Sequence, residues 1–429
     1  MTPVSESNRE RSRARVVLGV SGGIAAYKAC ELLRLFTESD HDVTVVPTAA
    51  ALEFVGAPTW AALSGKPVSA SPWDDVHEVP HVRIGQAADL VVVAPATADV
   101  LAKAATGLAD DLLTNTLLTA RCPVVFAPAM HTEMWEHPAT RANVETLRRR
   151  GSLVIEPAEG RLTGADTGKG RLPDPAEIFA FATGVLRRAS TGSSTGGLST
   201  GSTTDMAGRH VVVSAGGTRE YLDPVRFIGN RSSGLQGYAL ARTAAARGAE
   251  VTLVAANTAL ADPAGVKVIR VSSTAELQDA MTAAASGADA VVMAAAPADF
   301  RPASYRESKI KKAEDGSAAP IELVQNPDVL AGLVAARSAG ERPVIVGFAA
   351  ETGDAEGSVL DHARAKLARK GCDLLVVNDV GGGKVFGELE NEAVLLGRDG
   401  SQSAVPRSSK EAVADAIWDG VAALLAPGD

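Results

Sequence analysis

The sequence predicts an α/β protein with two doubly wound, Rossmann-like domains whose sheets are mainly parallel, joined by a linker of Gly, Ser and Thr. The length of 429 residues is the first reason, because domains contain about 100–200 residues. The second reason is that short apolar strands alternate with helical stretches, and the third is that this alternation occurs twice. Strands with apolar side chains at successive positions are buried on both faces, which is typical of parallel sheets covered by helices.

The first half of the chain opens with a strand, a glycine loop and a helical stretch. We expect the strand at Arg15–Val20 and the helical stretch at 24–38. Three further strands are expected at 42–46, 90–94 and 124–127, with another helical stretch at 100–118. This order predicts a parallel sheet whose ligands lie beyond the carboxyl ends of its strands.

A segment with almost no apolar residues separates the two halves. Residues 189–205 are nearly all Gly, Ser or Thr, so they bury too little apolar surface to fold by themselves. We therefore predict four regions, which are a disordered tail at 1–14, a first domain at 15–188, a flexible linker at 189–207 and a second domain at 208–429.

The second half repeats the plan of the first. Strands are expected at 210–214, 250–255, 290–295, 344–347 and 374–377, with a helix at 235–247. Short sequences also repeat, since DVTVV at 42–46 matches EVTLV at 250–254, and ADLVVVA at 88–94 matches ADAVVMA at 288–294. The two halves are therefore expected to share one architecture.

Composition excludes several classes of protein. Hydrophobic residues make up 46% and charged residues 22%, as in ordinary globular proteins. The formal net charge of −9 offers no basic excess for a phosphate backbone, so no nucleic-acid partner is expected. No apolar run reaches the roughly 18–20 residues that span a bilayer, so no membrane association is expected.

The cysteines and the first residues indicate the compartment. Cys30, Cys122 and Cys372 lie far apart without C-x-x-C spacing, which argues against a disulfide framework or a structural zinc site. The N-terminal segment is polar and rich in Arg, and it lacks the apolar stretch of a signal peptide. A cytoplasmic location is therefore expected.

The first glycine loop predicts an anion site. Gly22 and Gly23 let a ligand approach the backbone closely, and the helix that follows points free N–H groups at it. The loop lacks the G-x-G-x-x-G spacing of dinucleotide folds, and the second strand leads to Thr48 instead of an acidic residue that would bind a ribose. A mononucleotide such as FMN is therefore favoured over NAD. The alternative is a loop that only makes a tight turn.

Further polar side chains surround the next two strands. Thr97 and Asp99 come just after the third strand, and the residues PAMHTEMW at 128–135 follow the fourth. His81 precedes the third strand. A single histidine in a loop is more often solvated than catalytic, so its position alone assigns it no role.

Long motifs in both halves resemble known enzyme families. The first half is similar to the phosphopantothenoylcysteine decarboxylase flavoproteins in SGGIAAYK (21–28), PHVRIGQAADLVVVAPATAD (80–99), GLADDLLT (107–114) and PAMHTEMW (128–135). The second half resembles the phosphopantothenate–cysteine ligases in SAGGTREYLDPVRFIGNRSSG (214–234), KIKK (309–312), QNPDVL (325–330), VGFAAET (346–352) and VVNDV (376–380). The order of the halves is that of the bifunctional coenzyme A biosynthesis family of bacteria.

The first resemblance implies an FMN-dependent decarboxylase that acts on 4′-phosphopantothenoylcysteine. Loss of CO₂ from this substrate needs an electron sink, which the flavin provides by oxidising the thiol. His81 matches the catalytic histidine of the family, and Met130 and His131 match residues that contact the substrate. The resemblance places FMN against Ser21, Gly22, Gly23, Ile24, Thr48, Pro95, Ala96, Thr97 and Asp99.

Two positions depart from the decarboxylase pattern. The family usually has Asn where this chain has His131, and that Asn binds the substrate carboxylate; an imidazole also donates a hydrogen bond. The family usually carries a proton-donating Cys in a flap. The matching stretch 162–171 has no Cys and places Thr163 or Gly164 there, so the proton donor is not assigned.

The second resemblance implies a CTP-dependent ligase that joins 4′-phosphopantothenate to L-cysteine through an acyl-cytidylate. Lys309 matches the lysine that acts in activation of the carboxylate. Asn230 matches the residue that holds the acyl-cytidylate, and Arg226 matches a residue that acts with it in converting this intermediate. Two interpretations of Asp328 stay open, a nucleotide ligand or only a helix N-cap. Mg²⁺ is expected with CTP, without assigned protein ligands. The CTP-binding residues implied are Ala294, Ala295, Asp299, Lys309, Pro327, Asp328, Val329, Leu330, Phe348, Lys366 and Lys370.

Two other functions fit parts of the sequence. An NAD(P)-dependent oxidoreductase of two Rossmann-like halves fits the architecture, but its glycine and acidic signatures are missing. A regulatory flavoprotein without catalysis fits His131 and the absent flap Cys, although His81, Asn230 and Lys309 are retained. The resemblance also implies assembly into a homo-oligomer.

Overall fold

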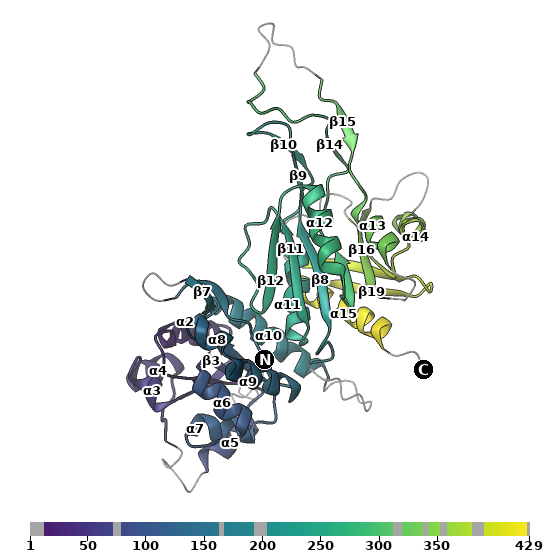
Figure 1. Cartoon of the computed structure of the whole chain (residues 1–429). Helices are drawn as coiled ribbons and strands as arrows, with labels where there is room; N and C mark the ends of the chain where they lie inside the picture. The colour runs from purple at the N-terminus through teal and green to yellow at the C-terminus, as the bar shows by residue number, and fades with distance from the viewer. Residues whose placement is uncertain are drawn as a thin grey trace, which may run out of the picture. The chain divides into compact units, whose positions relative to one another are not determined.

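The computed structural model describes residues 13–71, 79–162, 167–192, 204–311, 320–337, 342–351, 358–379 and 390–426. The chain divides into two compact units, Met1–Thr204 and Asp205–Asp429. Figure 1 shows a sheet with helices packed on it in each unit. Most of the predicted tail and the middle of the predicted linker, at 193–203, lie outside the described residues.

A five-stranded parallel sheet forms the centre of the first unit. Its order is β2-β1-β3-β4-β5, and every neighbouring pair is parallel. The reversal of strand order between β1 and β3 is a topological switch point, the place where α/β folds of this order bind ligands. The strands are β1 (Arg15–Val20), β2 (Asp42–Pro47), β3 (Leu90–Ala96), β4 (Val124–Pro128) and β5 (Leu153–Val154).

The helices of the first unit include one clear departure from the sequence prediction. The single helical stretch predicted over 100–118 is wrong, because Gly107 ends one helix at φ 76° and Asp111 begins the next with a capping box. The helices are α2 (Ala26–Glu38), α3 (Ala49–Leu52), α4 (Ala57–Ser64), α5 (Pro80–Ala87), α6 (Ala98–Thr106), α7 (Leu112–Thr119), α8 (Thr132–Glu136), α9 (Pro138–Arg149) and α10 (Pro175–Gly192).

A small hairpin, which the sequence analysis did not predict, lies outside the main sheet of the first unit. Strands β6 (Ala158–Arg161) and β7 (Thr167–Arg171) pair in antiparallel fashion. The hairpin contains glycines and charged residues in place of an apolar run, which is why its strands gave no signal. Of the stretch 162–171, residues 167–171 form β7, whereas the predicted flap positions Thr163 and Gly164 lie outside the described residues.

An eight-stranded mixed sheet forms the centre of the second unit. Its order is β12-β11-β8-β13-β16-β17-β18-β19. The first six strands are parallel, and the last two are antiparallel additions at one edge. The strands are β8 (His210–Gly216), β11 (Glu250–Ala256), β12 (Val266–Val271), β13 (Ala290–Met293), β16 (Val344–Glu351), β17 (Leu374–Asp379), β18 (Glu390–Gly397) and β19 (Gln402–Ser409).

Helices and two short ribbons complete the second unit. The helices are α11 (Leu235–Ala246), α12 (Thr274–Ala285), α13 (Val329–Ala336), α14 (Val359–Lys370) and α15 (Lys410–Leu425). The ribbons are β9 (Arg219–Tyr221) with β10 (Phe227–Gly229), and β14 (Phe300–Pro302) with β15 (Leu323–Gln325). All five strands predicted in this half are confirmed, and the switch point lies between β8 and β13.

Candidate functional site

The loop after β1 is held against the end of β3 in the first unit. The Ser21 hydroxyl donates a hydrogen bond of 2.7 Å to the Pro95 carbonyl and accepts one of 2.9 Å from the backbone N–H of Thr97. The side chain of Ser21 is buried. These bonds join the two strands at the switch point, so the loop that begins at Ser21 lies where the strand order predicts a ligand.

The two glycines of this loop leave its backbone accessible. A Cβ on Gly22 would lie 2.4 Å from the Cβ of Ala50, so only glycine fits there. Beside Gly23 only Thr97 comes near, at 3.9 Å. Among the described residues, the backbone N–H groups of Gly22, Gly23 and Ile24 have no protein acceptor. Free amides just before helix α2 are the donors that a phosphate group needs, so the loop fits the phosphate of a mononucleotide.

The predicted threonines have local partners. The hydroxyl of Thr48 accepts from the N–H of Ala51 and caps α3, and that of Thr97 accepts from the N–H of Val100 and caps α6. The carboxylate of Asp99 pairs with Lys103 at 3.1 Å. These side chains, together with Pro95 and Ala96 in β3, lie around the carboxyl ends of the central strands.

His81 is presented by an unusual stretch of backbone. It is the second residue of α5, and Val79 just before the helix has φ 45°. A left-handed conformation is uncommon and strained for a β-branched residue. The carbonyl of His81 accepts a bond of 2.8 Å from the Thr119 hydroxyl, whereas its ring Nδ1 is buried without a partner among the described residues. No protein group among the described residues therefore uses this ring nitrogen.

His131 lies against the hairpin at the end of β4. The backbone N–H of Met130 donates to the carbonyl of Gly170, at 2.9 Å. A Cβ on Gly170 would lie 2.2 Å from the Met130 carbonyl oxygen, so this close approach of β7 requires glycine. His131 is exposed and its side chain does not cap α8. The hairpin thus lies beside both residues predicted to contact the decarboxylase substrate.

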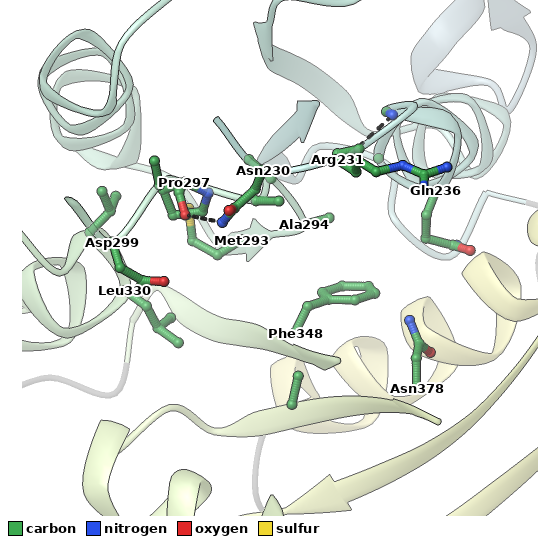
Figure 2. Close-up of a pocket in the computed structure, with 18 of the residues that line it drawn as sticks. Asn230, Arg231, Gln236, Met293, Ala294, Pro297, Asp299, Leu330, Phe348 and Asn378 are labelled. Atoms are coloured by element: carbon green, nitrogen blue, oxygen red, sulfur yellow. Dashed lines mark hydrogen bonds between the residues drawn. The ribbon is translucent and has the colours of Figure 1, made fainter. Parts of the chain in front are cut away.

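A cavity of about 470 Å³ opens at the carboxyl ends of the parallel strands in the second unit. Figure 2 shows Asn230, Asp299, Phe348 and other side chains around it. The structure brings together in its wall Asn230 and every residue predicted to bind CTP except Lys309, namely Ala294, Ala295, Asp299, Pro327, Asp328, Val329, Leu330, Phe348, Lys366 and Lys370.

Positive charge and one ion pair mark part of this cavity. Lys366 and Lys370 lie one helical turn apart on α14, and Lys370 forms an ion pair with Asp328. Burial raises the pKa of the Asp328 carboxyl, but the hydrogen bond and charge of Lys370 outweigh it, so this pKa lies below its ordinary value. Asp328 also caps α13 by accepting from the N–H of Ala331, at 3.0 Å. Its capping role is therefore present in the structure.

The side chain of Asn230 is fixed at the edge of the cavity. Its Nδ2 donates to the Pro297 carbonyl at 2.8 Å, as Figure 2 shows. A Cβ on Gly217 would lie 2.4 Å from the Asn230 carbonyl oxygen, so the glycine lets the two loops approach closely. A second cavity of about 390 Å³ shares part of its wall with the first. It is lined by Gly217, Thr218, Arg219, Phe227, Gly229, Asn230, Arg231, Ser232, Ser233 and Asn257.

Arg226 and Lys309 lie outside the wall of the large cavity but belong to adjoining segments. Arg226 Nη1 donates to the Ile310 carbonyl at 3.1 Å and approaches Asp223 at 3.4 Å. Lys309 precedes Ile310 and is exposed. The structure therefore brings these two predicted catalytic residues together but separates them from the nucleotide residues.

Sequence reasoning missed several polar residues in the wall of the large cavity. Gln236, Asn378, Asn391 and Lys410 all line it. Asn378 was part of a quoted motif, VVNDV, but no role was assigned to it. Asn391 belongs to the antiparallel edge of the sheet and Lys410 begins the helix that follows this edge. Neither element was predicted, so nothing placed these two residues near the others.

Among the described residues, no helix is long and apolar enough to cross a membrane, and no group of His, Cys, Asp and Glu is arranged to hold a metal ion.

Two family models match the chain. The Flavoprotein model matches residues 4–187, and the model of the DNA/pantothenate metabolism flavoprotein C-terminal domain matches residues 206–425, just over half of the chain.

The chain is also similar to named proteins over nearly its whole length. It is 60% identical over 424 residues to the coenzyme A biosynthesis bifunctional protein CoaBC of Mycolicibacterium smegmatis, covering 97% of this chain and 99% of that protein. It is 42% identical over 411 residues to CoaBC of Vibrio cholerae, covering 94% and 96%. A crystal structure of the C-terminal domain of a CoaBC protein shares 32% identity with a TM-score of 0.44, covering 52% of this chain and 98% of that one. The chain therefore belongs to the family of bifunctional coenzyme A biosynthesis proteins.

Proposed function

We propose that this chain performs two consecutive steps of coenzyme A biosynthesis. The second unit ligates 4′-phosphopantothenate with L-cysteine at the expense of CTP, and the first unit decarboxylates the resulting 4′-phosphopantothenoylcysteine with FMN. As a member of its family the chain is a bifunctional decarboxylase and ligase. The observation that best supports the ligation step is the single cavity that collects the side chains expected around CTP.

The ligase cavity has the features that activation of a carboxylate requires. The substrate carboxylate attacks the α-phosphate of CTP and pyrophosphate leaves, so cations are needed around the phosphates. We assign Lys366 and Lys370, which line the cavity, to the triphosphate, and Lys370 then exchanges its ion pair with Asp328 for the phosphates. We assign Asp299 to accept a hydrogen bond from the cytosine amino group or the ribose.

The second ligase step needs residues that hold the acyl-cytidylate while the amine attacks. Asn230 lies at the edge of the cavity with its amide oriented by Pro297, so it is suited to hold this intermediate. Arg226 and Lys309 lie in two adjoining segments of the second unit, outside the wall of this cavity. We assign Lys309 to stabilise charge on the phosphates and Arg226 to the conversion of the intermediate.

The first unit is suited to hold FMN through the free amides of the 22–24 loop and the residues around Thr48 and Thr97. When bound, FMN supplies a reversible two-electron oxidant. The chain's own residues then bind the substrate and move protons. The unpartnered Nδ1 of His81 supports its assignment as the base. His131 is assigned to the substrate carboxylate, where imidazole donates in place of the family's amide.

Three further properties belong to the same proposal. Mg²⁺ accompanies CTP and takes most of its ligands from phosphates and water. A homo-oligomer is supported by large exposed apolar side chains on the ribbons of the second unit, which are Tyr221, Phe227, Phe300 and Leu323. The three cysteines are free thiols, which agrees with a reducing cytoplasm.

The experiment that tests the proposal measures pyrophosphate release from CTP by the purified chain. We expect pyrophosphate release that depends on 4′-phosphopantothenate. A parallel assay of CO₂ release should show that decarboxylation depends on bound flavin. Turnover of a nicotinamide cofactor would instead support an NAD(P)-dependent oxidoreductase. Flavin binding without any turnover would support a regulatory flavoprotein. Either result would contradict the proposed two-step function.

A further inference from the structure

Four polar side chains in the large cavity of the second unit are not used by any role above. They are Gln236 on α11, Asn378 on β17, Asn391 on β18 and Lys410 at the start of α15. These elements adjoin one another, because β17 pairs with β18 and α15 packs against α11, β17 and β18. The Gln236 side chain also donates a hydrogen bond of 3.1 Å to the Lys410 carbonyl. Figure 2 shows Gln236 and Asn378 at the cavity.

Three amide oxygens of this group have no donor among the described residues. They are Gln236 Oε1, Asn378 Oδ1 and Asn391 Oδ1, and each of these atoms is buried. Asn391 as a whole is only 5% exposed. A buried acceptor without a donor is unfavourable, so its retention in the wall of a cavity indicates a bound group that brings donors.

Lys410 adds a buried cation to the same set of elements. The residue is 7% exposed and lines the cavity, and its backbone is fixed as the first residue of α15. A lysine ammonium group in the wall of a cavity attracts the anionic group of a ligand. Acceptors for N–H groups together with one cation match a small molecule that carries an amine and a carboxylate, which is an α-amino acid.

We propose that Gln236, Asn378, Asn391 and Lys410 form the subsite for the amino-acid substrate of the ligase. The three amide oxygens accept hydrogen bonds from the two N–H bonds of its amine and the S–H bond of its thiol, and Lys410 binds its carboxylate. The assignment rests on the proposed ligase function, which supplies the amino acid as second substrate.

Neutral acceptors suit the chemistry of this step. A carboxylate would hold the amine as ammonium, whereas amide oxygens orient the N–H bonds and leave the lone pair free to attack. The carboxylates among the described lining residues are Asp299 and Asp328, and Asp328 is paired with Lys370. The amine nitrogen forms a bond to the acyl carbon as the bond from that carbon to the phosphate oxygen breaks. CMP leaves with those electrons, and the surplus proton of the amine passes to water.

The decisive experiment compares L-cysteine with cysteamine, which has the amine and thiol but no carboxylate. In the full-length chain we measure kcat/KM for both amines, with CTP and 4′-phosphopantothenate saturating. In Lys410→Met, the ratio of kcat/KM for L-cysteine to kcat/KM for cysteamine is expected to fall roughly ten- to hundredfold. This is the contribution of one hydrogen bond between charged groups. A merely structural loss would lower both values alike and leave the ratio unchanged. The control is Lys267→Met, which removes an exposed lysine on β12.

A second variant covers the case in which Lys410→Met does not fold. Asn378→Leu is expected to raise KM for both amines at least tenfold, while pyrophosphate release in the first turnover without any amine stays at the wild-type rate. An unchanged ratio in Lys410→Met or unchanged KM values in Asn378→Leu would overturn the subsite and leave the ligase function intact. Wild-type protein that releases no pyrophosphate from CTP would overturn both.

Discussion

The carboxylate of Asp223 accepts a hydrogen bond of 3.1 Å from the backbone N–H of Ile310. The same carboxylate accepts bonds of 2.8 Å from the backbone N–H groups of Val225 and Arg226. Because Ile310 follows Lys309, this one buried side chain joins the turn that carries Arg226 to the segment that carries the proposed activation lysine. Burial raises the pKa of Asp223, but the hydrogen bonds and Arg226 outweigh it and hold the pKa below its ordinary value.

Asp223→Asn tests whether this link positions the ligase residues. An amide of the same size keeps the volume but replaces one acceptor oxygen by a donor, so the segment that carries Lys309 is expected to shift. We expect pyrophosphate release from CTP to fall about ten- to hundredfold, because small misplacements of catalytic groups are costly. Asp262→Asn, which alters an exposed carboxylate paired with Arg270, is the matched control and should retain its rate.

The lowered pKa of Asp223 also predicts a pH dependence of stability. A carboxyl group whose pKa is lower in the folded than in the unfolded chain stabilises the fold above its unfolded pKa, and this stabilisation is lost as the pH falls through the folded pKa. Wild-type protein should therefore lose more stability than Asp223→Asn between neutral pH and strongly acidic pH. Thermal melts across this range measure the difference, and parallel losses would refute the assigned pKa direction.

His81→Asn tests the decarboxylase assignment. Removal of a general base lowers a rate by about 10²–10⁴-fold, so CO₂ release should fall by at least a hundredfold while CTP-dependent ligation is retained. His137→Asn is the control, since His137 is exposed and caps α9, a position that Asn also fills well. Normal CO₂ release by the His81 variant would remove this residue from the mechanism.

His131→Asn restores the residue that the family usually has. Imidazole and amide side chains both donate a hydrogen bond to a carboxylate, so kcat/KM for 4′-phosphopantothenoylcysteine should stay within about tenfold of the wild-type value, whereas His131→Leu, which has no donor, should lower it roughly ten- to hundredfold. The measurement is kcat/KM of both variants. Equal values in the Asn and Leu variants would show that His131 does not bind the substrate carboxylate.

Lys370→Met tests the triphosphate site. The variant removes the cation that pairs with Asp328 and leaves a carboxylate facing the cavity, so KM for CTP should rise roughly ten- to hundredfold. Arg364→Met is the matched control on the same helix, because Arg364 contacts Gln402 and lines a different pocket. Equal KM values in the two variants would argue against Lys370 as a triphosphate ligand.

The parallel cores of both units could be predicted from the sequence because their strands are buried on both faces. β3 is buried at every position and reads as an uninterrupted apolar run. β18 alternates buried and exposed residues, and β19 is mostly exposed, so neither gave that signal. The break between α6 and α7 depends on Gly107 and Asp111, which apolar periodicity alone does not reveal.

The residues of the candidate sites also fall into those that the sequence indicated and those that it did not. Thr97 and Asp99 were found because they follow a predicted strand, and parallel strands bring their carboxyl ends to one edge. Ser21 and Asp299 were identified only through the resemblance to the two enzyme families. Lys410 was missed because its place in the cavity depends on the β18–β19 edge and on its contact with Gln236. The link from Asp223 to Ile310 joins residues 87 positions apart, and no local pattern indicates such a bond.

The most direct measurement incubates the purified, flavin-loaded chain with 4′-phosphopantothenate, L-cysteine and CTP and follows the products by mass spectrometry. We expect 4′-phosphopantothenoylcysteine to form first and 4′-phosphopantetheine to replace it, with CMP and pyrophosphate formed in proportion. Under the same conditions His81→Asn should stop at 4′-phosphopantothenoylcysteine, and Asn230→Asp should accumulate acyl-cytidylate. A flavin-loaded chain that leaves all three substrates unchanged would contradict the assignment of both reactions.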